Sequence, residues 1–254
     1  MMTTMRKLIP TLLLLTLLTL PTLPLAAQQY TGLNGLIHVP SADMDEEGVA
    51  RLGAHALNKH FTSAGFIYKG DGKKYNTSDY YISATVFPWL EMSYAFTLLK
   101  LHQHSYTTIG EVSYKHKDRN LSIKIRLLKE KKWWPSVAIG GNDLHGTGYL
   151  TNYWMALSKH HDWGGHLLGA HAAWRDWRNS RSHKGNKKWN GLVGGITYSP
   201  PIDHHHLRGI VEYTGHEINV GADYLLLGHV LLQASLQQGR YFSGGLCFQM
   251  DLLK

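Results

Sequence analysis

The chain has 254 residues, a formal net charge of +8 at pH 7 and a single cysteine, Cys247. One cysteine excludes an internal disulfide framework, so backbone hydrogen bonds and packing must hold the fold. The composition includes 26 Gly, 8 Trp and 14 Tyr, which suits a β-rich protein with many turns. The positive charge favours acidic partners, namely anionic polysaccharide, lipid phosphates or nucleic acid.

An export signal is predicted at the N-terminus. Arg6 and Lys7 form a positively charged start, and a continuous apolar stretch built almost wholly from Leu and Thr follows them. We expect cleavage after Ala27, which makes residues 1–27 a signal peptide and residues 28–254 a single domain. The alternative is an uncleaved anchor helix, because the stretch could barely span a bilayer. Loss of two of the 26 Lys and Arg leaves the mature chain basic, and export excludes nucleic acid as its partner.

The rest of the chain alternates apolar and polar residues over short segments, as expected for β-strands with one apolar and one polar face. Between Leu90 and Leu98, apolar residues occupy every second position, and Glu, Ser, Ala and Thr lie between them. We predict thirteen strands, at Val49–Phe61, Asp79–Phe87, Leu90–Leu98, Thr108–Lys117, Leu121–Leu128, Pro135–Asn142, Tyr149–His160, Trp163–Arg175, Trp189–Ser199, His206–Thr214, Ile218–Leu226, His229–Gln237 and Tyr241–Asp251.

This pattern predicts an all-β fold, an antiparallel transmembrane β-barrel in a bacterial outer membrane. Within a bilayer only a helix or a closed sheet satisfies the backbone, and no apolar helix of sufficient length follows the signal. Closed bacterial barrels have an even number of strands, so we expect 12 strands. The alternative is 14, if the short apolar segment at Leu33–Val39 also pairs. A secreted β-sandwich that binds glycans would accommodate the same strands.

Several segments resemble the YjbH family of outer-membrane exopolysaccharide-export proteins. The matching stretches are GLNGLIHVPSAD from Gly32, FPWLEMSYAF from Phe87, DRNLSIKIRLLKE from Asp118, PSVAIGGNDLHGTG from Pro135, GGITYSP from Gly194 and INVGADY from Ile218. The resemblance implies an outer-membrane barrel that takes part in producing or secreting an extracellular or capsular polysaccharide. It also implies small periplasmic partners. Typical members are much longer and resemble two barrel-sized parts.

Charged residues in the middle of strands are the candidate functional site, because they need a hydrated lumen or ionic partners. Lys124, Arg126, Glu212 and Asp223 lie in the middle of predicted strands. Glu91, near the start of its strand, and Asp143, directly after a predicted strand, complete the candidates. On neighbouring strands they would form an ion-pair ladder that fixes the register of the sheet. The alternative interpretation makes Lys124 and Arg126 a basic track for an acidic sugar chain.

We predict no metal site and no cofactor. Histidine is abundant, at 17 residues, but adjacent residues on a strand point apart, and the clusters His160–Asp162 and His204–His206 fall in predicted connections. The segment Asn142–Gly148 has the composition of a turn. No glycine-rich loop followed by Lys-Ser or Lys-Thr is present, which argues against nucleotide binding.

We therefore expect a non-enzymatic outer-membrane barrel in exopolysaccharide or capsule export or assembly. Its expected partners are outer-membrane lipid and lipopolysaccharide, an acidic polysaccharide and periplasmic export proteins. The alternative is an outer-membrane enzyme that modifies lipid or glycan. A serine nucleophile would need a histidine base and an acid, and no G-x-S-x-G motif selects such a trio.

Overall fold

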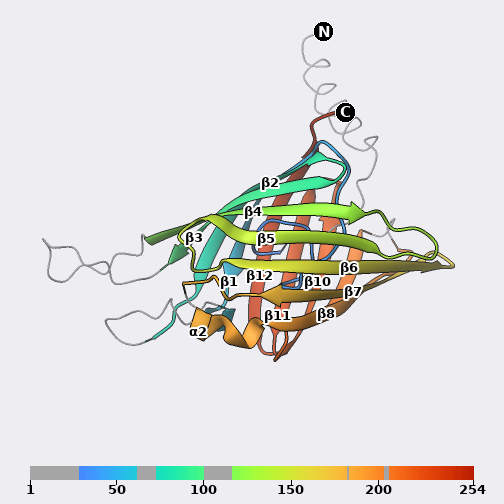
Figure 1. The fold of residues 1–254 in the computed structure, drawn as a ribbon. Helices are drawn as coiled ribbons and strands as arrows, with labels where there is room; N and C mark the ends of the chain where they lie inside the picture. Colours follow the sequence, from blue (N-terminus) through green and yellow to red (C-terminus); the bar gives the residue numbers. More distant parts are fainter. Residues whose placement is uncertain (1–28, 62–72, 100–115, 182, 203–205) are drawn as a thin grey trace, which may run out of the picture.

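The computed structural model describes residues 29–61, 73–99, 116–181, 183–202 and 206–254. Within these residues the chain forms one closed antiparallel barrel, in which β12 is hydrogen-bonded to β1 (Figure 1). Its strands are β1 (Val49–Leu57), β2 (Thr77–Phe87), β3 (Leu90–Leu99), β4 (His116–Leu128), β5 (Ser136–Gly146), β6 (Asn152–Trp163), β7 (His166–Asp176), β8 (Gly191–Ser199), β9 (Leu207–Tyr213), β10 (Ile218–Leu226), β11 (Val230–Gln237) and β12 (Tyr241–Asp251).

Helical structure in the described ranges is confined to short connections. These are η1 (Lys59–Phe61), α2 (His183–Asn186) and η3 (Lys187–Trp189). None of the helices described has the length and hydrophobicity needed to cross a bilayer.

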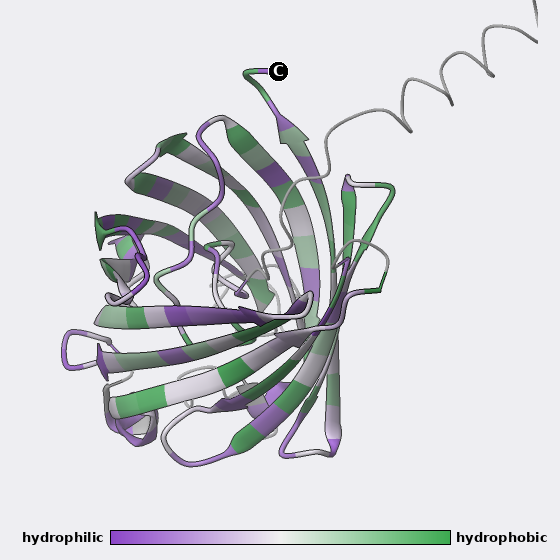
Figure 2. Ribbon diagram, turned by 90° about the vertical axis from the view of Figure 1, so that its right-hand side faces the viewer, coloured by the Kyte–Doolittle hydropathy of each residue, from purple (hydrophilic) through white to green (hydrophobic). Residues whose placement is uncertain are grey.

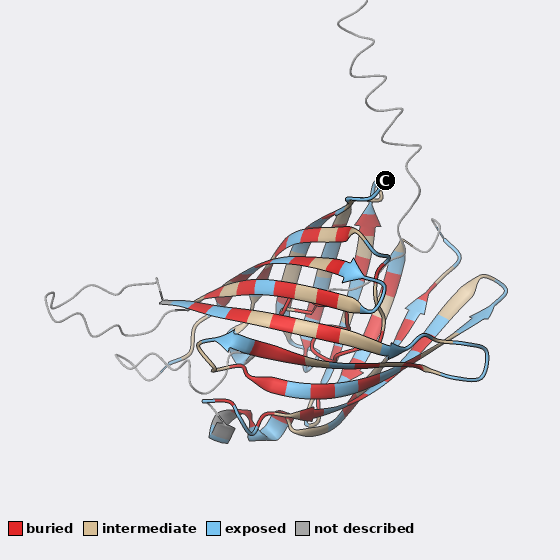
Figure 3. Cartoon of the chain, turned by 45° about the horizontal axis from the view of Figure 1, so that its top comes forward, coloured by how far each residue is buried: buried red, intermediate tan, exposed pale blue. Residues whose placement is uncertain are grey.

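The strands alternate buried and exposed residues along their length, as Figure 3 shows. On β3, Ser93 and Ala95 are buried, whereas Tyr94 between them is 44% exposed. The exposed residues are largely apolar and include Leu52 and Leu192, which are 64% and 65% exposed. Figure 2 shows the strands curving around a common interior with green and purple bands alternating along them. The barrel therefore reverses the arrangement of a soluble protein, since its inward side chains are mostly polar and its outward ones apolar.

The preferred expectation of 12 strands is confirmed. Of the predicted strand Thr108–Lys117, His116 and Lys117 begin β4, and residues 108–115 lie outside the described residues. The predicted signal peptide, residues 1–27, and His204 and His205 also lie outside them. Twelve antiparallel strands return the chain to its starting end, so the sheet can close without an unpaired edge.

The expected turn at Asn142–Gly148 begins later than predicted. Strand β5 continues to Gly146, and its pairing with β4 skips from Gly141 to His145. The residues between them form a bulge, in which Asp143 adopts a φ of 52°. A bulge absorbs extra residues within a ladder, and Asn, Asp and Gly tolerate the backbone conformations that it requires.

Residues 29–45, called the lumen segment below, lie inside the barrel. Its apolar residues Leu33, Leu36, Val39 and Ala42 are fully buried and pack against inward residues of the wall such as Trp154. Its one β-bridge joins Gly35 to Pro40, within the segment itself. The alternative of this segment as an additional wall strand is therefore wrong, because its backbone forms no ladder with either neighbouring strand.

The two ends of the barrel differ in their connections. The three longest, residues 58–76, 100–115 and 177–190, all join strands at the same end, called the loop end. The chain passes from the lumen segment into β1, and leaves β12, at the opposite end, called the turn end. Two of the turn-end connections are only two residues long, at Pro88–Trp89 and Gly164–Gly165.

Candidate functional site in the barrel lumen

Two glutamates of the wall accept hydrogen bonds from the backbone of the lumen segment. Glu91 on β3 accepts the N–H of Asn34 at 2.7 Å, and Glu212 on β9 accepts the N–H groups of His38 and Val39 at 2.8 and 3.0 Å. A buried segment without a sheet ladder needs such partners, because an unsatisfied buried amide destabilises the fold by roughly 1–3 kcal/mol. Glu91 and Glu212 thus replace the strand partners that the segment lacks.

Lys124 on β4 joins the wall to the lumen segment. Its ammonium lies 2.9 Å from Glu91 Oε2 and donates to the carbonyl oxygens of Asn34 and Asp43 at 2.9 and 2.6 Å. The side chain is fully buried, and Glu91 stands directly opposite it in the register of β3 and β4. The structure therefore brings these two predicted residues together and commits the lysine to internal contacts.

Two arginines that the sequence did not single out also bind the lumen segment. Arg51 on β1 forms an ion pair with Asp45 at 2.6 Å and donates to the side-chain oxygen of Asn34. Arg175 on β7 donates to the carbonyl oxygen of His38 at 3.0 Å. Arg51 carries the signal that selected Lys124, a charged residue at an inward position between two apolar ones, whereas Arg175 stands between Trp174 and Asp176 and lacks it.

The remaining candidates have different partners from those expected. Asp223 accepts two hydrogen bonds from Arg208 of β9, at 2.8 and 3.2 Å. Asp143 does not pair with Lys124 or Arg126, because those residues face Gly140 and Ala138 across the sheet. The bulge turns Asp143 toward the loop end, where its carboxylate accepts the N–H of Leu150 at 3.0 Å.

Arg126 lies at the turn end and is only partly buried. Its guanidinium donates to the carbonyl oxygen of Pro88. It lines a cavity of about 280 Å³ together with Lys129, Glu130 and Arg208. Asp43 of the lumen segment lies on the same cavity, which therefore joins the interior of the barrel to its turn end.

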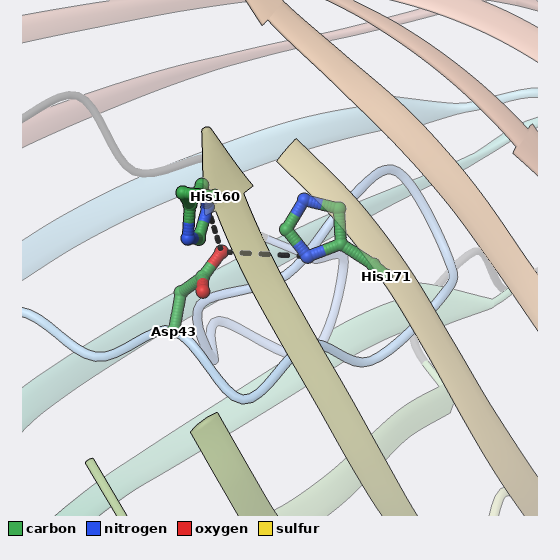
Figure 4. Close-up of side chains that lie close together, drawn as sticks. All are labelled: Asp43, His160 and His171. Carbon is green, nitrogen blue, oxygen red and sulfur yellow. Dashed lines mark ion pairs between the residues drawn. The ribbon is translucent and has the colours of Figure 1, made fainter. Parts of the chain in front are cut away.

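A cluster of two histidines and a carboxylate lies beside this cavity (Figure 4). Asp43 Oδ2 is 3.7 Å from His160 Nε2 on β6 and 3.6 Å from His171 Nδ1 on β7. Glu130 Oε2 lies 2.7 Å from the other nitrogen of His160. The predicted strand ended at His160, where a connection was expected to begin, but β6 continues to Trp163, and His160 faces inward.

Burial and nearby charges shift the pKa values of three titratable groups outside the strands, Asp43, Glu130 and His38. Burial raises the pKa of Asp43, but the nearby His171 and His160 rings and the Lys124 ammonium outweigh it and hold that pKa below its usual value. Burial also acts on Glu130, whose pKa is nevertheless lowered by hydrogen bonds from Lys159 and His160. Burial and the charges of Arg175 and His55 hold the pKa of His38 well below its usual value. Asp43 and Glu130 are thus anionic at neutral pH, and His38 is uncharged.

Comparison with known proteins places this barrel in a family. The YjbH family, described as exopolysaccharide biosynthesis protein YbjH, matches residues 27–254. The chain belongs to the YjbH family. The resemblance inferred from the sequence motifs is therefore confirmed.

A curated relative supports the same assignment. The uncharacterized lipoprotein YjbH of Escherichia coli (strain K12) is 26% identical over 258 residues, which cover 85% of this chain. The chain spans about a third of that relative, since the match covers 34% of its length.

Among solved structures, mutants of the Rhodopseudomonas blastica porin are similar. Two of them are 10% identical to this chain, with TM-scores of 0.30 and 0.31, and the matches cover 80% of this chain and 74% of the porin.

The lumen of this YjbH-family barrel also contains a serine beside the histidine–aspartate pair. Ser158 Oγ lies 2.9 Å from His171 Nδ1, the same nitrogen that faces Asp43. A catalytic triad needs the serine and the acid on opposite nitrogens of the imidazole, so that the ring can pass a proton. The second nitrogen of His171 instead lies 3.1 Å from Thr197 Oγ1, and Ser158 also accepts the N–H of Ala42. This geometry does not support hydrolysis by Ser158.

Proposed function

We propose that this chain is an outer-membrane component that takes part in exopolysaccharide export or assembly without catalysing a reaction. The observation that carries the proposal is a YjbH-family match over a closed barrel whose exposed outer face is apolar. An apolar outer face requires a hydrocarbon environment, and in a Gram-negative envelope closed barrels with this pattern belong to the outer membrane. Phospholipid and lipopolysaccharide would then cover the outer face.

The barrel would lie with its turn end toward the periplasm. Outer-membrane barrels have short turns on the periplasmic side and longer loops outside the cell. The three longest connections here share the loop end, which would accordingly face outward. Periplasmic export proteins would meet the turn end, where the cavity with Arg126, Lys129 and Arg208 opens.

An acidic polysaccharide would contact this chain at the turn end. The lumen segment fills the interior, and Lys124 is bound to Glu91 and to the segment's carbonyl groups. Arg126, by contrast, is half-buried and Lys129 is exposed, and both line the turn-end cavity. We therefore replace Lys124 by Lys129 in the basic track considered from the sequence. Arg126 and Lys129 can attract the carboxylates of an acidic sugar chain.

Charge reversal at the turn end tests the proposal. In a strain that lacks the native gene, Arg126→Glu combined with Lys129→Glu should reduce the polymer recovered from the cell surface. The matched control is Lys184→Glu combined with Lys187→Glu, which reverses two exposed charges at the loop end and should leave the yield unchanged. Fractionation and heat-modifiability gels would show equal amounts of folded barrel in every strain.

Two results would count against the proposal at different levels. If deletion of the gene leaves polymer secretion unchanged, the role in exopolysaccharide production fails. If deletion reduces secretion but the turn-end reversal does not, the polymer contact at Arg126 and Lys129 fails while the wider role stands.

A further inference from the structure

We propose that Asp43, His160 and His171 form a binding site for a divalent transition-metal ion of the zinc class, which fastens the lumen segment to the barrel wall. The three residues come from three different elements, the lumen segment, β6 and β7. A metal at this point would therefore connect the buried segment to two adjacent strands. The proposal does not rest on the role in exopolysaccharide production.

The geometry of the cluster fits such an ion. The three ligand atoms, Asp43 Oδ2, His160 Nε2 and His171 Nδ1, all lie within 4.8 Å of one another. Zinc binds nitrogen and oxygen ligands at about 2.0–2.2 Å, so neighbouring ligands of a tetrahedral site are roughly 3.4 Å apart. The carboxylate oxygen is already 3.6–3.7 Å from both ring nitrogens, and Figure 4 shows the two rings on either side of it. Closure around an ion needs movements of only a few tenths of an ångström at these two pairs.

The second nitrogen of each ring has a partner that can accept a hydrogen bond from it, as the required tautomer demands. Glu130 Oε2 lies 2.7 Å from His160 Nδ1, so a proton on Nδ1 leaves the Nε2 lone pair directed at Asp43. Thr197 Oγ1 lies 3.1 Å from His171 Nε2, so a proton there leaves the Nδ1 lone pair available. Histidines that bind metals usually donate their other N–H in this way. In these tautomers both rings would present a nitrogen lone pair to an ion held by the same carboxylate.

The carboxylates in the cluster can bind a cation. Asp43 and Glu130 bring two carboxylates to the cluster. Three basic groups around the cluster are already paired with carboxylates: Lys124 with Glu91 at 2.9 Å, Arg208 with Asp223 at 2.8 Å and Lys159 with Glu130 at 2.8 Å. Arg126 and Lys129 line the adjoining cavity. Ser158 Oγ would give up its 2.9 Å contact with His171 Nδ1 when a metal occupies that position. The adjoining cavity leaves room for water as a fourth ligand, as in sites with three protein ligands.

The test uses the full mature chain in detergent, purified with an affinity tag that contains no histidine. After dialysis against EDTA, Zn²⁺ alone is titrated by calorimetry. We expect one ion bound per wild-type chain and loss of that binding in His160→Ala combined with His171→Ala. The matched control is His161→Ala combined with His166→Ala, which removes one histidine from each of the same two strands but leaves the cluster intact.

A second measurement follows the lumen segment itself. Zn²⁺ should slow amide hydrogen exchange across residues 29–45 in the wild type, because an ion held by Asp43 ties the segment to β6 and β7. Asp43→Asn keeps the size of the side chain, and it should bind Zn²⁺ at least tenfold more weakly and abolish the slowing. The proposal is overturned if the wild type binds no Zn²⁺, or if the His160–His171 double variant or Asp43→Asn binds it as the wild type does. If the double variant does not fold, Asp43→Asn decides the question.

Discussion

At the scale of single residues, the lumen is a set of inward charges, several of which hold the same buried segment. Glu91 and Glu212 accept amide protons, and Lys124, Arg51 and Arg175 donate to carbonyl or side-chain oxygens. These charged groups are shielded from water, so each depends on its partner to offset the loss of hydration. Removing one member of a pair should therefore disturb the interior more than replacing both.

Lys124→Ala should lower the free energy of unfolding by about 3–5 kcal/mol, because it leaves the Glu91 carboxylate buried without its cation. Replacing both members, with Glu91→Gln and Lys124→Met, should recover much of the loss. Tryptophan fluorescence during urea unfolding in detergent measures both effects. Lys187→Ala, an exposed control, should change the unfolding free energy by less than about 0.5 kcal/mol. Equal losses for Lys124→Ala and the double variant would contradict the pairing.

The alternation of residues was sufficient to predict that Lys124, Glu91, Glu212 and Asp223 face the lumen, but not which atoms they bind. Partners depend on the register between strands and on the lumen segment, and neither follows from the periodicity of one strand. Arg208 faces Asp223 because of the pairing of β9 with β10. The Asp43–His160–His171 cluster was missed for a related reason, since Asp43 comes from a segment whose position inside the barrel the sequence does not specify.

At the scale of elements, the lumen segment is the part that the sequence described least well. Its apolar stretch GLNGLIHVP has the composition of a strand, and strand or buried coil cannot be separated by composition over so short a length. The wall strands, by contrast, repeat their alternation over many residues, and twelve of the thirteen predicted strands appear. Close packing of its side chains against the barrel wall helps to hold the lumen segment in place. A Cβ atom at Gly195 of β8 would collide with Leu36, so the glycine makes space for that side chain.

Leu36→Ala should loosen the lumen segment without opening the sheet. Leu36 is fully buried in the cluster with Leu33, Val39 and Trp154, and such truncations lower stability by about 2–5 kcal/mol. Hydrogen exchange at residues 29–45 should accelerate, while exchange within the strands stays as in the wild type. Leu192→Ala removes an equal side chain from the outward face and is the matched control. Acceleration of the same size in both variants would show that Leu36 does not seat the segment.

At the scale of the whole molecule, two surfaces of one sheet are solvated differently. The outward side chains are largely apolar and exposed, and the inward ones are mostly polar, with several charged residues bound to a segment of the same chain. The barrel therefore has a lumen wall suited to water but an interior occupied by protein. Residues 29–45 occupy the lumen, and the interior charges would line an aqueous channel if the segment left.

Removal of the lumen segment should accordingly open the barrel. A variant that lacks residues 29–45, with a heat-modifiability gel to establish that it is folded, should show steady ion conductance in planar bilayers, whereas the wild type should show little. A synthetic peptide with the sequence of residues 29–45 should restore closure, because Glu91, Glu212 and Arg175 still offer its partners. A scrambled peptide of the same composition should not, since those hydrogen bonds and the packing of Leu36 depend on residue order. A folded variant with the conductance of the wild type would mean that the remaining side chains close the lumen and that the segment is not its plug.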